Sequence, residues 1–381
     1  MKIYFFMHTV FGPGGGVLTV VRHLAEDLAK QHEVEIVSVV RPRREPVHPL
    51  PDNVKVRSLV DTGPLASDPD VQRPSKLMPE DEPHYPAYSL ATDRALEQFL
   101  PSVRDGVLLG MQPGVNLAIA KLADPSVVRV GQMHRPFEPQ RKQLRKAEKK
   151  YFPRLDAFLT LTEGDAAKYR EFLDRSLRIE VIPNATPAYG GERSTLENKV
   201  VTAAGHLRPN KGFDRLVDAW AIVAEQHPDW ELRIFGNGPL QEELQKQIDD
   251  LGLEGKVRLM GYSTALREEM AKSSLFAMTS HKEAYGMVLV EAMSCGVPVV
   301  SFDSPNGPAS IINEGVDGFL VRNGDIGGLA ERISRVIEMG ASGRKALGDA
   351  GLRNAAGRTQ PVVTGRWVSL LEELQREKSR R

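Results

Sequence analysis

Short apolar runs alternate with amphipathic segments along the whole chain. In the first half, the apolar and β-branched runs that predict strands are Ile3–Met7, Val34–Val40, Val54–Leu59, Gly106–Leu109, Val127–Gln132, Phe158–Thr162 and Ile179–Pro183. Helical patterns lie between them at Val17–Lys30, Tyr88–Leu100, Pro139–Tyr151 and Gly164–Leu173. Strands that are apolar on both faces and separated by helices are typical of parallel α/β layers.

The alternation starts again after a stretch rich in Pro and Gly at residues 183–191. The strands expected there are Lys199–Ala204, Glu231–Phe235, Lys256–Met260, Leu275–Thr279, Val297–Phe302 and Gly318–Val321. The helices expected between them are Phe213–His227, Leu240–Leu251 and Ile326–Met339. Since 381 residues exceed one ordinary core, we expect two α/β domains, residues 1–186 and 187–361, with a linker near residues 184–192. Asp61–Pro86, rich in Pro and acidic residues, predicts a long surface loop.

Composition places the chain among soluble globular proteins, with 41% hydrophobic and 26% charged residues. Lys and Arg together number 50, as do Asp and Glu, so no overall field favours nucleic acid or membrane. The single Cys295 excludes an intrachain disulfide and fits a reducing compartment. No signal peptide or membrane-spanning apolar run is visible, so we expect a cytoplasmic protein that at most touches the inner membrane surface.

The run His281–Glu291 is the strongest candidate for chemistry in the chain. It follows a predicted strand and begins a helix, so the backbone N–H groups of Gly286–Val288 point above the sheet, where a helix start attracts phosphate. Glu291 lies about one turn inside this helix and Glu283 precedes it, so their carboxylates can reach hydroxyls on either side of an anion. This pattern predicts a nucleotide-sugar ligand. The alternative is a half-buried helix whose glutamates face water.

A second candidate is the loop Gly205–Gly212, which follows the first strand of the second domain and precedes a helix. Arg208 offers a forked donor and Lys211 a compact charge, which suits a leaving diphosphate at the carboxyl end of a strand. The alternative is a solvated basic loop.

The first strand leads into a glycine-rich turn, Phe11–Val17, which lets a ligand approach bare backbone N–H groups. A dinucleotide site would need G-x-G-x-x-G, and this turn has Val17 at the third glycine position. Arg41 stands where such a site carries an acidic residue, which disfavours NAD but leaves NADP open.

The segment Glu283–Glu291 resembles the Glu-x7-Glu signature of retaining glycosyltransferases of family 4 (group 1), and the resemblance extends over essentially the whole chain. That family has the GT-B fold, so the resemblance implies two Rossmann-like α/β domains facing across a cleft. The first would bind the acceptor and the second the donor. The terminal helix, residues 362–381, would cross back onto the first domain.

The resemblance also implies roles for individual residues. Glu291 would hold the ribose hydroxyls of the nucleotide, and Glu283 a hydroxyl of the donor sugar. Arg208 and Lys211 match the phosphate ligands of the family's R-x-x-x-K-G pattern, with a spacing that is one residue shorter here. Catalysis would then depend on Arg208, Lys211, Glu283 and His134, the last matching a histidine that touches the donor sugar.

Further positions follow from the same resemblance. The other residues implied at the donor site are Gly15, Gly16, Gly205, Gly236, Tyr262, Tyr285, Gly286, Met287 and Val288. Gly15 and Gly16 would contact either the donor diphosphate or the acceptor. His8 is a weaker candidate than His134 for a contact from the first domain. Ser310 stands where many relatives carry a glutamate, which weakens any inference about the donor.

The expected activity is the transfer of a hexose from a nucleoside-diphosphate sugar, with UDP favoured, to a hydroxyl acceptor. No metal or other cofactor is expected, because Arg208 and Lys211 would take up the growing charge and no DxD motif or His/Cys cluster is visible. Opposed carboxylates of a glycosidase are disfavoured, since one segment carries both glutamates. A sugar phosphorylase on the same fold and a non-catalytic nucleotide-binding module remain as alternatives.

A basic cluster lies in the predicted helix Pro139–Tyr151. Its members are Arg141, Lys142, Arg145, Lys146, Lys149 and Lys150. The cluster is either a solvated helix face or a surface for an anionic acceptor or an acidic lipid.

Overall fold

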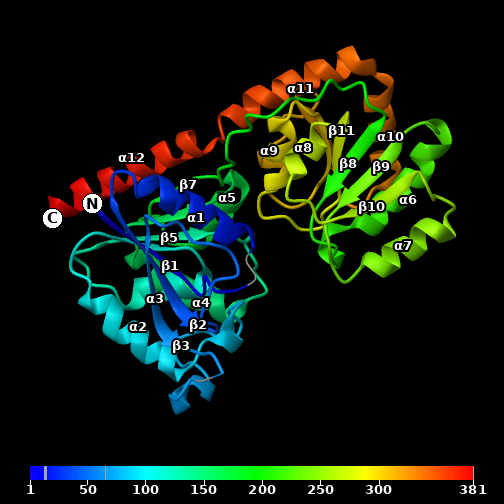
Figure 1. Ribbon diagram of the computed structural model, residues 1–381. Helices are drawn as coiled ribbons and strands as arrows, with labels where there is room; N and C mark the ends of the chain where they lie inside the picture. The colour runs from blue at the N-terminus through cyan, green and yellow to red at the C-terminus, as the bar shows by residue number, and fades with distance from the viewer. Residues whose placement is uncertain (13–14, 65, 381) are drawn as a thin grey trace. The chain divides into compact units, whose positions relative to one another are not determined.

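The computed structural model describes residues 1–12, 15–64 and 66–380 (Figure 1). The chain divides into two compact units: Met1–Pro183 together with Gln360–Arg381, and Asn184–Thr359. The boundary expected from the sequence was residue 186, against Pro183 here, and the expected start of the returning helix was 362, against Gln360.

The first unit contains a parallel sheet that has seven strands within the described residues, in the order β3-β2-β1-β4-β5-β6-β7. The strands are β1 (Lys2–Met7), β2 (Glu33–Arg41), β3 (Lys55–Asp61), β4 (Val107–Gly110), β5 (Val128–Met133), β6 (Ala157–Thr160) and β7 (Ile179–Val181). The inner strands β1, β4 and β6 are buried along nearly their whole length, because helices cover both faces of the sheet.

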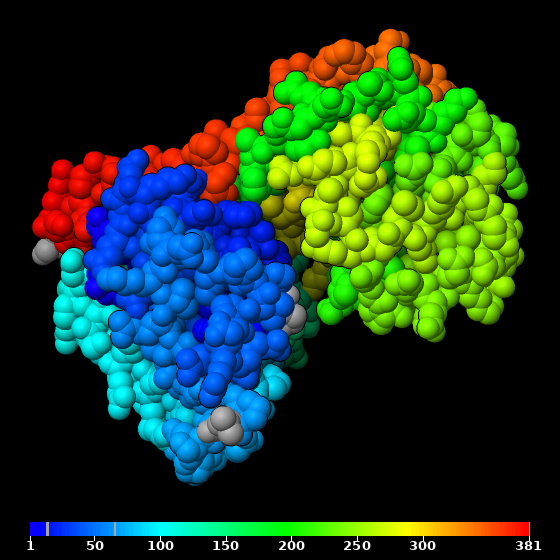
Figure 2. All heavy atoms as spheres, in the orientation of Figure 1, coloured from blue at the N-terminus to red at the C-terminus, as the bar shows by residue number. Residues whose placement is uncertain are grey.

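The helices of the first unit are α1 (Gly16–Leu28), α2 (Leu90–Ser102), α3 (Pro113–Leu122), α4 (Lys142–Tyr151), α5 (Glu163–Phe172) and α12 (Gln360–Ser379). The terminal helix α12 lies along α1, as the red and blue segments of Figures 1 and 2 show. Its apolar stripe, which includes Trp367 and Leu371, is buried, and the Thr364 hydroxyl donates to Asp27 at 3.0 Å. The prediction that this helix returns to the first domain is confirmed.

The second unit repeats the architecture. Its described strands form one parallel sheet in the order β10-β9-β8-β11-β12-β13. They are β8 (Val200–Ala204), β9 (Glu231–Phe235), β10 (Val257–Gly261), β11 (Leu275–Met278), β12 (Val299–Asp303) and β13 (Gly318–Arg322). The helices are α6 (Phe213–Gln226), α7 (Gln241–Asp250), α8 (Leu266–Met270), α9 (Met287–Ser294), α10 (Ile326–Glu338) and α11 (Gly340–Ala356). The predicted fold class, two Rossmann-like α/β domains, is confirmed.

Two features differ from the sequence-based expectation. The helices α3, α8 and α11 were not expected; α3 is buried on nearly every side, which removes the polar face that makes a helix visible in a sequence. The segment Asp61–Pro86 is not simply a surface loop. Met78 is buried in the core, and the Asp93 carboxylate accepts hydrogen bonds from the Ser75 hydroxyl at 2.6 Å and the Lys76 N–H at 2.7 Å.

None of the helices in the described part of the chain combines the length and the apolarity that crossing a bilayer requires.

Candidate functional site

The second unit brings two loops together at the switch point of its sheet. Strands β8, β9 and β10 follow one another toward one edge of the sheet, and β11, β12 and β13 toward the other edge. The strands β8 and β11 are neighbours, so the chain leaves them toward opposite sides of the sheet. In open parallel sheets, ligands bind in the crevice that such diverging loops leave at the carboxyl ends of the strands. The first loop contains Arg208 and Lys211, and the second contains Glu283 and leads into α9.

Backbone contacts hold the two loops against each other. The short 3-10 turn η4 (Pro209–Lys211) ends at Gly212, whose φ is +63°. A Cβ at Gly212 would lie 2.3 Å from the carbonyl oxygen of Thr279, so both conformation and space require glycine. The Thr279 hydroxyl donates to the carbonyl oxygen of Lys211 at 3.1 Å. The position of Lys211 is therefore set by the neighbouring strand end.

Lys211 and Glu283 form an ion pair across these loops. The Lys211 Nζ lies 2.6 Å from Oε2 of Glu283, and the two side chains are 25% and 18% exposed. The cation predicted for the diphosphate and the carboxylate predicted for the sugar hydroxyl are thus within reach of one bound molecule. Arg208 is exposed at the start of the same 3-10 turn.

Helix α9 begins directly after this pair. Gly286 precedes the helix with φ +103°, a conformation that favours glycine, and the first turn contains no acidic side chain. The N–H groups of Met287 and Val288 belong to the first turn and have no carbonyl partner within the helix, so they are available to an anion. The backbone donors and the Lys211 ammonium therefore lie on the same loop-helix junction.

Glu291 lies one turn inside α9. Burial raises the pKa of Glu291 above its usual value, and the positive charge of Arg267 on α8 opposes that shift. A carboxyl group shielded from water makes stronger hydrogen bonds to a hydroxyl ligand, because solvent competes less. Arg267 was not singled out from the sequence, since it is followed by Glu268 and Glu269 in a short helix that matches no motif.

Tyr285 has a structural role that the sequence did not show. Its side chain is buried, and its hydroxyl accepts a hydrogen bond from Arg358 Nε at 3.0 Å. Arg358 Nη2 also donates to the carbonyl oxygen of Ser310 at 2.8 Å, which ties the loop after β12 to the loop after β11. Arg358 lies 73 residues from Tyr285, so no local pattern could indicate this contact.

The ends of β8, β9 and β10 contribute the remaining predicted positions. Gly236 has φ +136°, and a Cβ there would lie 1.9 Å from the carbonyl oxygen of Gly205. Tyr262 follows β10 and is 73% exposed, so its ring presents an open aromatic face at the carboxyl edge of the sheet. An exposed aromatic ring at this edge is suited to stacking against a nucleobase.

The candidates from the first unit lie at its own strand ends. His134 follows β5 and is largely buried. Gly15 and Gly16 are exposed at the start of α1, where the Gly15 carbonyl accepts the Thr19 N–H at 3.2 Å. Two residues of the predicted turn, at positions 13 and 14, lie outside the described residues.

His8 is held in a buried ring cluster at the end of β1. The backbone N–H of His8 donates to Gln112 Oε1 at 2.7 Å, and the His8 ring stacks on that of His84 with the centroids 5.2 Å apart. Burial lowers the pKa of His8 to about 4, and the charge of His84 adds to the shift. His8 is therefore neutral at physiological pH.

Among the residues that the structure describes, no three His, Cys, Asp or Glu side chains group as metal ligands would. Cys295 is buried and burial raises its pKa to about 12, so it is a packed thiol rather than a nucleophile.

Two parallel sheets of this topology, with cations, carboxylates and a helix start at the switch point of the second, form the α/β architecture of the two-domain glycosyltransferase type. Known families divide the chain in the same way. The family described as Glycosyltransferase Family 4 matches residues 14–188, and the family described as Glycosyl transferases group 1 matches residues 191–353. The chain belongs to the group 1 and family 4 glycosyltransferases.

Individual relatives include a phosphotransferase as well as glycosyltransferases. An exopolysaccharide phosphotransferase of Streptomyces coelicolor is 34% identical over 98% of this chain, which spans 41% of that protein. A poly(ribitol-phosphate) alpha-N-acetylglucosaminyltransferase of Staphylococcus aureus is 27% identical over 48% of this chain and 37% of its own length. The chain thus spans less than half of the length of these two relatives.

Solved structures show the same fold. TarM of Staphylococcus aureus, in complex with fondaparinux, alpha-GlcNAc-glycerol and UDP, has a TM-score of 0.76 at 15% identity, with 97% of this chain and 99% of that chain covered. HepE of Anabaena, in complex with UDP, has a TM-score of 0.75 at 19% identity, with 98% and 100% covered.

Proposed function

We propose that this protein is a retaining glycosyltransferase that transfers a hexose from a UDP-sugar to a hydroxyl acceptor. The observation that carries the proposal is the Lys211–Glu283 ion pair at the switch point, directly before the start of α9. A diphosphate needs cations and N–H donors, and the adjoining sugar and ribose need acceptors for their hydroxyls. The junction supplies both kinds of group.

The chemistry follows from where charge develops. As the bond between the sugar C1 and the diphosphate oxygen breaks, Arg208, Lys211 and the first N–H groups of α9 take up the growing negative charge. The acceptor oxygen bonds to C1, and its proton passes to the departing diphosphate oxygen on the same face. The anomeric configuration is then retained, and no separate protein base is required. Glu283 would orient the sugar and Glu291 the ribose.

The two cations would replace a divalent metal in this scheme, so we propose that transfer is independent of metal. His134 at the end of β5 is assigned to the donor sugar. Gly205, Gly236 and Tyr262 would line the nucleoside side of the site, with the exposed Tyr262 ring against the base.

Related proteins support a UDP-sugar as the donor and a hydroxyl compound as the acceptor. Both fold neighbours described above were solved with UDP. The Staphylococcus aureus relative acts on poly(ribitol-phosphate), and a Bacillus subtilis relative, 29% identical over 44% of this chain, acts on poly(glycerol-phosphate). We therefore propose a hydroxyl acceptor that carries phosphate. Action at the cytoplasmic membrane surface is a further proposal.

The test begins with thermal shift of the full chain in UDP, GDP, UDP-glucose, UDP-N-acetylglucosamine and NADP. Stabilisation by UDP and a UDP-sugar is expected; a shift with NADP alone would overturn the proposal. Release of UDP from the stabilising sugar nucleotide, in a panel of hydroxyl acceptors with and without EDTA, then measures turnover. Phosphate-dependent release of a sugar phosphate from a glycoside, without nucleotide, would instead favour a phosphorylase.

Arg208→Ala separates an enzyme from a binding module. The rate of UDP release should fall by about 10²- to 10³-fold, as for the loss of one donor to a developing anion. Arg258→Ala is the matched control, because Arg258 is an exposed arginine of β10 in the same unit. UDP binding without any turnover of donor in the unsubstituted chain would favour the module.

A further inference from the structure

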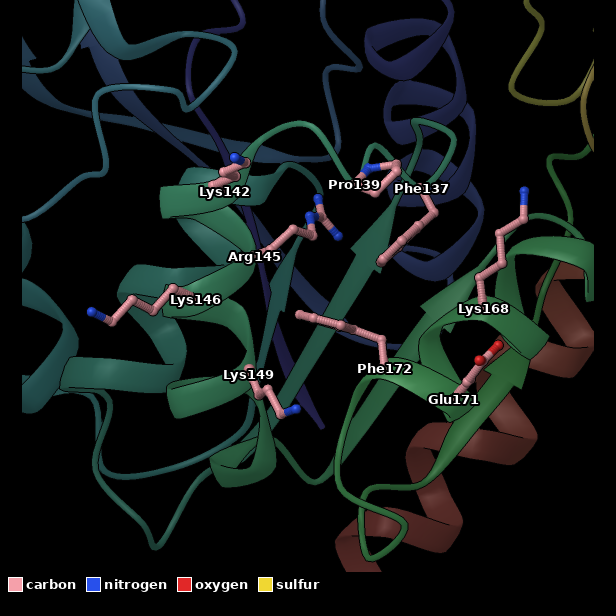
Figure 3. Close-up of a pocket in the computed structure, with 9 residues that line it drawn as sticks. All are labelled: Phe137, Pro139, Lys142, Arg145, Lys146, Lys149, Lys168, Glu171 and Phe172. Carbon is pink, nitrogen blue, oxygen red and sulfur yellow. The ribbon is translucent and has the colours of Figure 1, made fainter.

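The first unit contains a large cavity away from its switch point. It lies between α4 and α5, has a volume of about 850 Å³ and opens to solvent (Figure 3). In Figure 3, Phe137, Arg145 and Phe172 point into the space between the two helices. None of the candidate residues of the donor site lines this cavity.

The inner part of the cavity is aromatic. The rings of Phe137 and Phe172 have their centroids 5.4 Å apart, and Pro139 lies beside them. The Lys149 ammonium lies 5.7 Å from the centroid of the Phe172 ring. Concave sites lined by apolar rings with a few charged groups are typical of binding sites for discrete ligands.

The charge at the rim is strongly positive. Of the nine lining residues, five are cationic and Glu171 is the acidic one. Lys142 and Lys149 lie on α4 and Lys168 on α5, so cations flank the opening from both helices. An anion in the opening would be attracted from two sides, while the lysine stems cover apolar surface.

The floor of the cavity contains a buried arginine. Arg145 is only 6% exposed, its Nη1 donates to the Tyr169 hydroxyl at 2.6 Å, and its guanidinium lies 4.8 Å from the centroid of the Phe137 ring. Its buried Nε has no hydrogen-bond partner in the described structure. Burial raises the pKa of the neighbouring Glu148 to about 8 although Arg145 opposes the shift. Oε2 of Glu148 lies 2.5 Å from Nη1 of Arg145, so this ion pair adds less to the charge of the cavity than the lysines do.

We propose that this cavity binds a segment of an anionic acceptor in which sugar or polyol units are joined by phosphodiesters. The proposal rests on the proposed function and assigns the place where the charged part of the acceptor is held. The rings of Phe137 and Phe172 would pack against the carbon face of a unit. Arg145, with its forked donors, and the rim lysines would hold the phosphates.

A lipid surface fits these observations less well. A membrane-binding face needs apolar side chains that project outward, and the exposed large apolar residues of the described chain include none from α4 or α5. The aromatic rings here line a hollow instead. A discrete chain that enters the hollow satisfies both the rings and the cations.

The experiment compares two double variants of the full chain. Lys142→Gln/Lys149→Gln removes two cations that line the cavity. Lys150→Gln/Arg154→Gln removes two exposed cations that lie beside it and contact the Tyr151 ring instead. The probes are a poly(glycerol phosphate) oligomer, a neutral maltooligosaccharide of similar length, and phosphatidylglycerol–phosphatidylcholine vesicles. Binding of the oligomers is measured by calorimetry and that of the vesicles by flotation.

The oligomer should bind the unsubstituted chain, and the cavity variant should weaken it by about tenfold or more, while the control variant changes it by less than about twofold. The neutral oligosaccharide should bind far more weakly than the charged oligomer. Equal weakening by both variants, no binding of the charged oligomer, or loss of vesicle flotation in the cavity variant alone would each overturn the proposal. The thermal shift with UDP should be the same in all three proteins. Its absence from the unsubstituted chain would defeat the proposed function but not oligomer binding.

Discussion

The Lys211 ammonium lies 2.6 Å from the Glu283 carboxylate, although the two residues are 72 positions apart in the chain. The pair joins the loop after β8 to the loop after β11, the two central neighbours of the second sheet. Each charge holds the other in place before any ligand binds. A bound diphosphate would compete with Glu283 for the ammonium, and the released carboxylate would then be available to a sugar hydroxyl.

Glu283→Gln should separate sugar orientation from nucleotide binding. The amide keeps the size of the side chain but removes its charge, so Lys211 stays available to the diphosphate and affinity for UDP should change by less than about threefold. Release of UDP from the sugar nucleotide should fall by about 10²-fold or more, in the range seen when one catalytic contact is lost. Calorimetry and a UDP-release assay measure the two quantities.

The control for this variant is Glu242→Gln, at an exposed carboxylate in the first turn of α7. It should leave both quantities unchanged. Turnover by Glu283→Gln at the normal rate would show that the carboxylate has no part in the reaction.

Gly236→Ala should destabilise the second unit by about 3 kcal/mol or more. The substitution forces an unfavourable φ of +136° on alanine and places its Cβ 1.9 Å from the Gly205 carbonyl oxygen, a backbone atom that cannot move aside alone. Gly252→Ala is the matched control, because Gly252 also has a positive φ, +63°, but open space around it. It should cost about 1 kcal/mol. Urea unfolding gives both free energies, and equal costs would show that the close contact is not the cause.

Glu148→Gln should change how stability depends on pH. Because burial raises the folded-state pKa of Glu148 to about 8, from an ordinary value of 4.5, the folded protein keeps this proton over a range in which the unfolded chain has lost it. The contribution of Glu148 is therefore fully present below about pH 4.5 and is lost as pH rises to about 8. Replacement by Gln should remove that decline.

The measurement is the free energy of unfolding of both proteins between pH 5 and 8, the span set by these two pKa values. The difference between them should grow with pH, in favour of the variant. Glu97→Gln, an exposed position on α2 of the same unit, serves as the control and should run parallel to the unsubstituted chain. A parallel course for Glu148→Gln would mean that the carboxyl is ionised throughout.

Much of the architecture could be predicted from the sequence because a buried strand or an amphipathic helix places apolar residues in a regular local pattern. Runs such as Val34–Val40 are mainly apolar, and every position of this run is buried, as a strand covered on both faces requires. This pattern does not reveal a helix that is buried on every side, or a segment that is held by residues distant in the sequence. Helix α3 has no polar face to mark its period, and the segment around Met78 is anchored by Asp93, at a distance that no local pattern can report.

The candidate site divides in the same way. The local order of Glu283, the glycine before α9, and Glu291 belongs to the sequence itself, because one short segment carries all three and a glycine must precede a helix that starts from a positive φ. Only the tertiary structure decided that Lys211 meets Glu283, that Arg358 holds Tyr285, and that burial changes the pKa of Glu148. These properties depend on which distant groups displace water around a side chain. That is settled by the packing of the sheets and helices and not by the order of residues.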